Sequence, residues 1–147
     1  WTTVIFGLLL YFSDLIKVKK TISKDFNFKH AFYIGLFQAL SLMPGVSRSG
    51  ITITAARFLN FNREDSAKIS FLISVPTLGA ISLYGLQNLF IEKSFELSLL
   101  NFFTIILSFG FSYLTIKIFL QFLRKFSLLS FVIYRVILGS LILVYAY

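Results

Sequence analysis

Apolar runs alternate with short polar connectors along almost the whole chain. Three of these runs, at 66–90, 97–123 and 128–147, reach the roughly 20 residues that a helix needs to cross a bilayer. A shorter run at 1–12 has the character of the end of a further transmembrane helix. An open sheet edge cannot face lipid, because its backbone groups would stay unpaired. The pattern therefore predicts an all-α integral membrane protein, a polytopic helix bundle.

Two shorter apolar runs flank Pro44-Gly45 within residues 31–62. Each is too short to span a membrane, and proline removes a backbone donor from a helix. We interpret 31–62 as a re-entrant broken-helix hairpin, whose irregular backbone faces a cavity or is buried in protein. The alternative is one kinked span from Ala31 to Phe61, which would place Arg48 near its middle.

The charged residues lie mainly in the connectors. The chain carries 14 Lys and Arg against 6 Asp and Glu, a net charge of +8. The basic connectors at 13–30 and 124–125 are typical of cytoplasmic loops, and the acidic connector at 91–96 is expected on the outer side. No separate basic domain is visible, which argues against a nucleic-acid partner. The composition, 57% hydrophobic with a mean hydropathy of +0.84, agrees with a membrane environment.

Two further features of the sequence limit the interpretation. The chain has no cysteine, which excludes disulfides and thiolate metal sites. Trp1 opens the chain inside an apolar run without a basic leader, so we expect a fragment that begins within a helix.

The polar residues between the two half-length helices form a compact motif at 44–52. A helix start exposes unpaired N–H groups and carries a partial positive charge, so it favours anions. Arginine adds a planar fork of donors that fits phosphate, and serine hydroxyls can cap the helix or donate to a phosphate oxygen. We predict a phosphate cradle whose catalytic residues are Arg48, Ser47, Ser49 and Thr52 and whose substrate-binding residues are Gly45, Val46 and Gly50.

Each motif residue taken alone also has a less specific explanation. A Pro-Gly pair can simply kink a helix, serine and threonine can bond back to their own helix, and an arginine can neutralise a neighbouring carboxylate. Their concentration in nine positions favours the phosphate site. Arg48 is expected to hold the diphosphate and the charge that develops on it. Ser47 is a weaker candidate for the nucleophile, because no base accompanies it in this chain.

Four residues outside the motif also bear on the site. Arg57 and Arg63 are more consistent with anchors at the inner membrane face than with residues that steer the diphosphate. Arg135 can either contact the site or pair within the bundle. His30 ends a basic connector and is expected to be solvated rather than catalytic. All six carboxylates lie in connectors, so we expect no metal ligand beside Arg48 in this chain.

The motif resembles the signature of the undecaprenyl-diphosphatase family, the bacitracin-resistance membrane phosphatases. The resemblance includes the flanking stretches 34–40, 62–64, 70–76 and 131–135, and so extends over essentially the whole chain. It implies an inverted-repeat fold with two re-entrant hairpins in the bacterial cytoplasmic (inner) membrane. It also implies hydrolysis of undecaprenyl diphosphate to undecaprenyl phosphate and phosphate, which recycles the lipid carrier for peptidoglycan synthesis.

The same resemblance implies an N-terminal half with a glutamate-rich motif and a serine–histidine motif, neither of which is in this chain. Those groups resemble the ligands of a divalent cation, Mg²⁺, with the nucleophile and the acid/base. We expect this chain to supply the phosphate-binding half of the site, with a polyprenyl diphosphate and the bilayer as partners and a homodimer left open. Two alternatives are a secondary transporter of an anion or lipid phosphate, which also holds anions at broken helices, and a fragment that is inactive alone.

Overall fold

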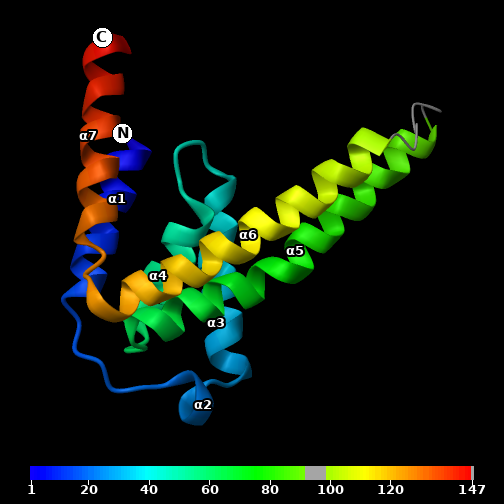
Figure 1. Ribbon diagram of the computed structural model, residues 1–147. Coiled ribbons are helices and arrows are strands. Elements are labelled where there is room, and N and C mark those ends of the chain that lie inside the picture. Colours follow the sequence, from blue (N-terminus) through cyan, green and yellow to red (C-terminus); the bar gives the residue numbers. More distant parts are fainter. Residues whose placement is uncertain (92–98, 147) are drawn as a thin grey trace.

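The computed structural model describes residues 1–91 and 99–146. Its elements are α1 (Thr2–Asp14), α2 (Ile22–Asp25), α3 (Phe28–Ala39), the 3₁₀ turn η1 (Leu40–Leu42), α4 (Arg48–Phe58), α5 (Arg63–Ile91), α6 (Leu99–Lys125) and α7 (Leu129–Ala146) (Figure 1). Within these ranges the only β pairing is one isolated bridge between Lys20 and Phe61. The all-α prediction is therefore confirmed for the described part of the chain.

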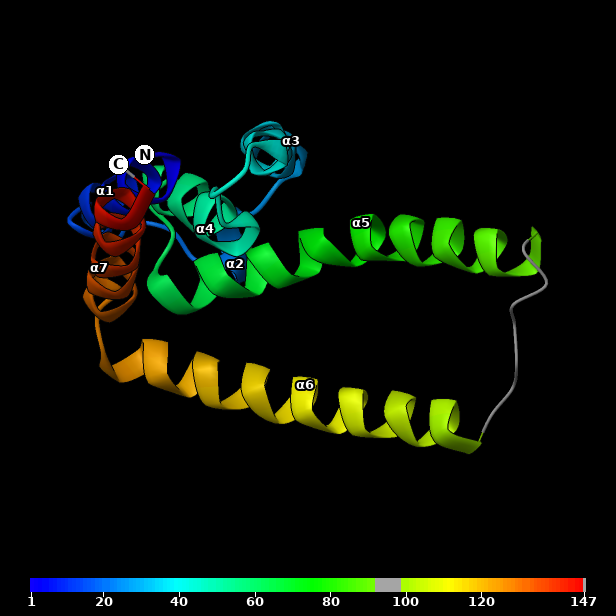
Figure 2. The same cartoon turned by 90° about the horizontal axis from the view of Figure 1, so that it is seen from above.

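The helices form three groups (Figures 1 and 2). α1 and α7 lie side by side, and the two chain termini point toward the same end of that pair. α3 and α4 occupy the centre, where α4 packs against α1, α3 and α5. α5 and α6 form a long pair that extends away from the other helices. α4 is thus the helix with the most neighbours, and its N-terminal end carries the motif.

α3 and α4 form an antiparallel hairpin. Asn27 caps α3 by accepting a hydrogen bond from the N–H of His30 (3.1 Å). Gly45, in the turn between the helices, has φ = +84°, a conformation that favours glycine. The ring of Phe61, just beyond α4, lies 5.2 Å from the ring of His30 at the start of α3. The chain thus returns to the level at which it entered, which one kinked span would not allow. Whether the hairpin is re-entrant in a membrane stays a prediction.

Small residues let α4 approach its neighbours closely. Ala55 and Ala56 are buried where α4 faces α3 and α5, with little side chain to keep the backbones apart. One buried cluster joins these helices and consists of Ile34, Ala55, Ala56, Phe61 and Ile69. A second cluster joins α4 to α1, α5, α6 and α7 and consists of Leu10, Ile53, Ala67, Leu123, Leu128 and Val132.

α5 and α6 are long and apolar enough to cross a membrane. Their candidate spans, Arg63–Gln87 and Leu99–Lys125, have mean hydropathies of 1.7 and 1.8, and little of either is buried against protein. α5 continues as a helix through Pro76. Exposed apolar surface of this extent suits lipid, in agreement with an α-helical membrane protein. α1 and α7 are apolar but shorter, so it stays a prediction that they cross the membrane. Residues 92–98, which contain most of the expected acidic connector, lie outside the described ranges.

A buried ion cluster lies at the C-terminal end of α4. Asp14, whose side chain is 8% exposed, accepts two hydrogen bonds from Arg63 (2.7 and 3.0 Å) and one from the N–H of Leu128 (3.2 Å). Arg57, 2% exposed, donates to three backbone carbonyls at 2.6, 2.9 and 2.8 Å, and its Nε lies 3.7 Å from Oδ1 of Asp14. We call Asp14, Arg57, Arg63 and the Leu128 N–H the Asp14 cluster. It joins the end of α1, the end of α4, the start of α5 and the α6–α7 turn.

The sequence predicts a solvated His30, and in the structure this residue is half-buried. Its ring stacks on Phe26 at 6.5 Å and meets the edge of Phe61 at 5.2 Å, and Nζ of Lys20 lies 3.1 Å from its Nε2. Burial, followed by the nearby Lys20 charge, lowers the pKa of His30 below its ordinary value. The partial burial could not be predicted locally, because Phe61 reaches His30 from the other end of the hairpin.

Candidate anion-binding site

The N-terminus of α4 is the centre of the site. Ser47 has an extended backbone and its Oγ accepts a hydrogen bond from the N–H of Gly50 (3.2 Å), so it is the N-cap of the helix. The N–H groups of Arg48 and Ser49 have no acceptor within the helix, because they precede its first complete turn. The hydroxyls of Ser47 and Ser49 lie 3.4 Å apart. This helix end offers backbone and hydroxyl donors together with the positive end of the helix dipole.

Two guanidinium groups flank this helix end. Nη2 of Arg48 donates to the carbonyl of Ser74 on α5 (3.1 Å), while its Nε is buried without a hydrogen-bond partner. Nη2 of Arg135 on α7 donates to the carbonyl of Gly45 (3.0 Å). Nη1 of Arg135 lies 2.7 Å from the position that a Cβ on Gly50 would occupy. Of the two options left open for Arg135, the structure shows contact with the motif.

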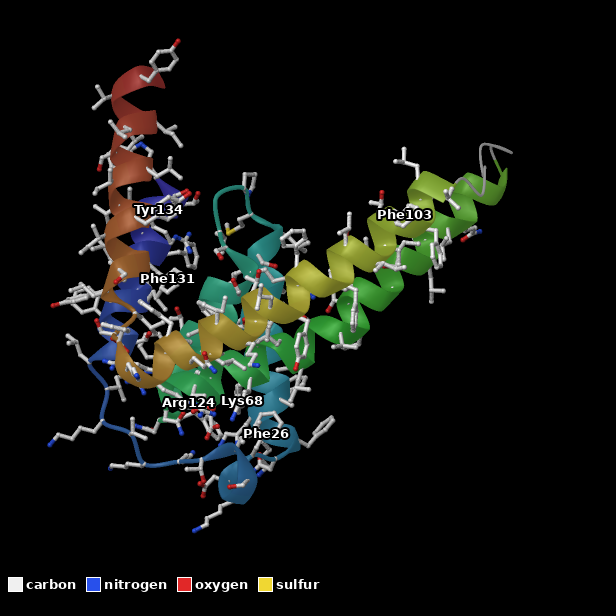
Figure 3. The ribbon with its side chains drawn as sticks, in the orientation of Figure 1. Phe26, Lys68, Phe103, Arg124, Phe131 and Tyr134 are labelled. Atoms are coloured by element: carbon white, nitrogen blue, oxygen red, sulfur yellow. The ribbon has the colours of Figure 1, made fainter. Side chains whose placement is uncertain are left out.

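The two arginines line different cavities. The first, about 460 Å³, contains Arg135 together with Gly45, Val46, Ser47, Ser49 and Gly50. Its apolar wall includes Phe131 and Tyr134, which Figure 3 shows on α7. The second cavity, about 710 Å³, lies between α5 and α6 and contains Arg48 and Ser49. The motif residues therefore line two adjoining cavities rather than the single cradle that the sequence predicts: Arg48 lines the second, most of the others line the first, and Ser49 lines both.

Thr52 lines neither cavity. It is 1% exposed, and its hydroxyl contacts the carbonyls of Arg48 (3.0 Å) and Ser49 (3.1 Å) and lies 2.6 Å from Oγ of Ser70. A hydroxyl has one proton, so Thr52 shares it between the two carbonyls, and the Ser70 hydroxyl is then the donor in the third contact. Thr52 thus fixes the first turn of α4 against α5, and it contacts the site through Arg48 and Ser49.

The turn that precedes α4 is held from α1. Oγ1 of Thr2 donates to the carbonyl of Pro44 (2.6 Å), and Oγ1 of Thr3 donates to the carbonyl of Gly45 (3.2 Å). The Gly45 carbonyl thus accepts from Thr3 and from Arg135 together. A Cβ on Gly45 would collide with both threonine hydroxyls, which is a second reason for glycine here besides its positive φ.

Several contributors to the site were not identified from the sequence. Ser70 and Ser74 contact Thr52 and Arg48 from α5, and Thr2 and Thr3 hold the turn from α1. A sequence signal existed for α5, where hydroxyl residues recur at 66, 70, 74 and 77 and so share one helix face. No equivalent signal marks the threonines, because their partner carbonyls lie 42 residues away.

The side chains that usually ligate a divalent cation are dispersed among the described residues. No group of three or more His, Asp or Glu side chains lies close enough together in the described ranges to hold a metal ion. The linings of the two cavities beside α4 contain neither a carboxylate nor a histidine. Ser47 accordingly has no base beside it there, so it can bind an anion but is not activated as a nucleophile by these residues.

Comparison with known proteins identifies the relatives of the chain. The family model described as bacitracin resistance protein BacA matches residues 1–141. A protein named undecaprenyl-diphosphatase from Pelagibacter ubique (strain HTCC1062) is 54% identical over 147 residues, which is 100% of this chain and 57% of that protein. Proteins of the same name from Dinoroseobacter shibae and Jannaschia sp. are 41% and 39% identical, each over 100% of this chain and 55% of their own length. The chain spans about half the length of these curated relatives, and it belongs to the bacitracin resistance protein BacA family.

Proposed function

We propose that this chain is part of a membrane phosphatase that hydrolyses undecaprenyl diphosphate to undecaprenyl phosphate and phosphate, and that it supplies the phosphate-binding part of the site. The open N-terminus of α4 between two guanidinium groups carries the proposal. Two helices long enough to span a membrane support a lipid environment for that anion site, where a lipid-linked phosphate is the expected ligand. The name shared by the relatives supports the diphosphate substrate.

In this proposal the chain binds and orients the diphosphate. The first-turn N–H groups of α4 and the hydroxyls of Ser47 and Ser49 are neutral donors, and Arg48 and Arg135 add charged donors. Negative charge builds on the phosphoryl oxygens as the bond to the leaving undecaprenyl phosphate breaks. Donors already fixed by the bundle stabilise that charge without having to reorganise, and a site that excludes water strengthens the effect.

The remaining catalytic groups are proposed to lie in the part of the family's length that this chain does not cover. The carboxylates of the Asp14 cluster and its surroundings lie at the far end of α4 from Arg48, and Asp14 is already paired with Arg63. We therefore place the ligands of the implied Mg²⁺, the nucleophile and the acid/base outside this chain. The cation would supply charge neutralisation to the diphosphate when bound.

We also propose that the α3–α4 hairpin is re-entrant and that the protein crosses the bacterial cytoplasmic membrane several times, as one half of an inverted repeat. Contacts between the connectors support placing these connectors on one side of the membrane. The connector after α1 and the α6–α7 turn, both predicted to be cytoplasmic, meet in the Asp14 cluster. Arg124 also pairs there with Glu64 at the start of α5 (2.8 Å), and Figure 3 shows Arg124 beside Lys68 at this end of the bundle.

Release of inorganic phosphate from undecaprenyl diphosphate, with and without Mg²⁺, tests the proposal. We expect release by a full-length family member that carries these residues, and diphosphate binding without release by this chain alone. A transporter would instead move the lipid phosphate or anion across a vesicle membrane without liberating phosphate. Transport without hydrolysis in the full-length protein would refute the phosphatase proposal.

Replacing Gly50 with alanine is expected to weaken diphosphate binding without unfolding α4. The new Cβ would lie 2.7 Å from Nη1 of Arg135, the end of a flexible side chain, and 3.2 Å from Cβ of Ser47, so the guanidinium is displaced and Ser47 gives way by a few tenths of an ångström. Alanine itself favours a helix over glycine by about 1 kcal/mol. We expect about a tenfold loss of affinity, the effect of one lost hydrogen bond to a charged group, in a titration of the full-length protein with a diphosphate-lipid analogue.

Gly79→Ala in α5 is the matched control for this variant, because a Cβ there would meet no atom within 4 Å. It is expected to leave affinity unchanged and to preserve the helix. Equal affinities for the Gly50→Ala and Gly79→Ala proteins would show that Arg135 does not contact the ligand.

A further inference from the structure

α6 presents two hydroxyl groups whose role the motif does not explain. Ser112 and Thr115 line the cavity of about 710 Å³ that also contains Arg48. They belong to the wall formed by α6, which runs alongside α5 in Figure 2, whereas Arg48 comes from α4 and is anchored on α5. Among the described residues, neither hydroxyl has a hydrogen-bond partner. The two residues are three positions apart on one helix and therefore share a face.

Some other hydroxyls in the same bundle bond to their own helix. Oγ1 of Thr104, also on α6, donates to the carbonyl of Leu100 (2.9 Å), and Oγ1 of Thr54 donates to the carbonyl of Gly50 (2.7 Å). Such back-bonding is the usual solution for a hydroxyl in a membrane helix, because an unpaired polar group in an apolar environment is costly. Ser112 and Thr115 share the lack of such a bond with Ser108 on α6 and Ser140 on α7, but unlike those two they line the cavity that contains Arg48.

Arg48 has unused donor capacity in the same cavity. Its Nη2 bond to the Ser74 carbonyl anchors one edge of the guanidinium, but its Nε is buried without a partner. The rest of the lining is mainly apolar and includes Phe71, Leu78, Phe111, Ile116 and Phe119. Charged and hydroxyl donors within apolar walls fit a ligand that joins a phosphate group to a hydrocarbon chain.

We infer that Ser112 and Thr115 are substrate-binding residues that donate hydrogen bonds, across the cavity, to the phosphate oxygens of the polyprenyl diphosphate that Arg48 holds. The inference rests on the proposed function and assigns α6 a direct part in the site. Because the hydroxyls do not bond to their own helix, the ligand supplies the acceptors that the protein does not.

Ser112→Ala and Thr115→Val in a full-length family member with these residues test the inference. Each is expected to raise KM for the diphosphate about tenfold, because a hydrogen bond to a charged group is lost, while kcat changes less. Thr115→Ser, which keeps the hydroxyl, is expected to restore most of the affinity. Thr104→Val is the matched control, since it removes from the same helix a hydroxyl that bonds to its own backbone.

Affinity for a non-hydrolysable diphosphate-lipid analogue gives a readout that does not depend on catalysis. Variants with the same KM and analogue affinity as Thr104→Val, in an active protein, would overturn the inference and leave the proposed function intact. Equal losses in Thr115→Val and Thr115→Ser would also overturn it, because packing rather than the hydroxyl would then be responsible. A wild-type protein that binds the analogue but releases no phosphate would contradict the proposed function alone.

Discussion

Arg48→Ala is expected to lower kcat/KM for undecaprenyl diphosphate about 1000-fold in a full-length family member, as measured by phosphate release. Arg48 places a fixed positive charge at the N-terminus of α4, and the Ser74 carbonyl holds that charge in position. An alanine removes the charge and the donors and leaves a cavity that water or lipid can enter. The loss is expected mainly in kcat if Arg48 binds the transition state more tightly than the substrate.

Arg48→Lys separates charge from geometry. Lysine keeps the charge but lacks the planar fork that contacts two phosphate oxygens together, so we expect a loss of about 10- to 100-fold. Arg124→Gln is the control, because Arg124 is largely exposed and pairs with Glu64 far from the motif. Near-normal phosphate release by Arg48→Ala or Arg48→Lys would defeat the assignment of Arg48.

Asp14→Ala is expected to destabilise the protein by about 3–5 kcal/mol, since it leaves a buried cation without its counter-charge. Arg57 is 2% exposed and cannot reach water without disturbing the end of α4. The same change removes the acceptor for Arg63 and for the Leu128 N–H, so three contacts between elements are lost together. Unfolding of the full-length protein in mixed detergent, followed by circular dichroism, measures the effect.

Asp25→Ala is the matched control for this experiment. Its carboxylate accepts a hydrogen bond from the N–H of Thr21 (2.9 Å) in an exposed turn, so its loss is expected to cost about 1 kcal/mol or less. Activity per folded molecule is expected to stay near normal in Asp14→Ala, because the cluster lies at the opposite end of α4 from Arg48. A stability loss no larger than that of Asp25→Ala would show that the cluster does not hold the bundle together.

The helices and the break between them follow from local features of the sequence. The apolar runs at 66–90 and 97–123 reappear as α5 and α6, because run length and the absence of helix breakers other than Pro76 are properties of adjacent residues. The Pro44-Gly45 pair marks the turn of the hairpin for the same reason. The family resemblance could also be recognised from the sequence, since the motif and its flanks are contiguous stretches.

The division of the motif between two cavities could have been anticipated from helix periodicity. Residues four apart share a face, so Arg48 and Thr52 point together, and both contact α5. Gly50 lies on the face toward Arg135. The sequence identifies Arg135 as a candidate but could not decide its partner, because its contact with the Gly45 carbonyl joins residues 90 positions apart. No local pattern specifies such a pairing, because it depends on how α7 packs against α1.

The contacts of Asp14 have a consequence for the order of assembly during synthesis. Its bonds with Arg63 and the backbone bonds of Arg57 join residues 41 to 49 positions apart, so they can form once α5 begins to emerge. The bond from Leu128 closes a loop of 114 residues and must come last. Since longer loops lose more entropy on closure, the early contacts precede the late one on thermodynamic as well as temporal grounds. The contacts that hold the end of the hairpin can therefore form before α7 packs against α1 and brings Arg135 into contact with the motif.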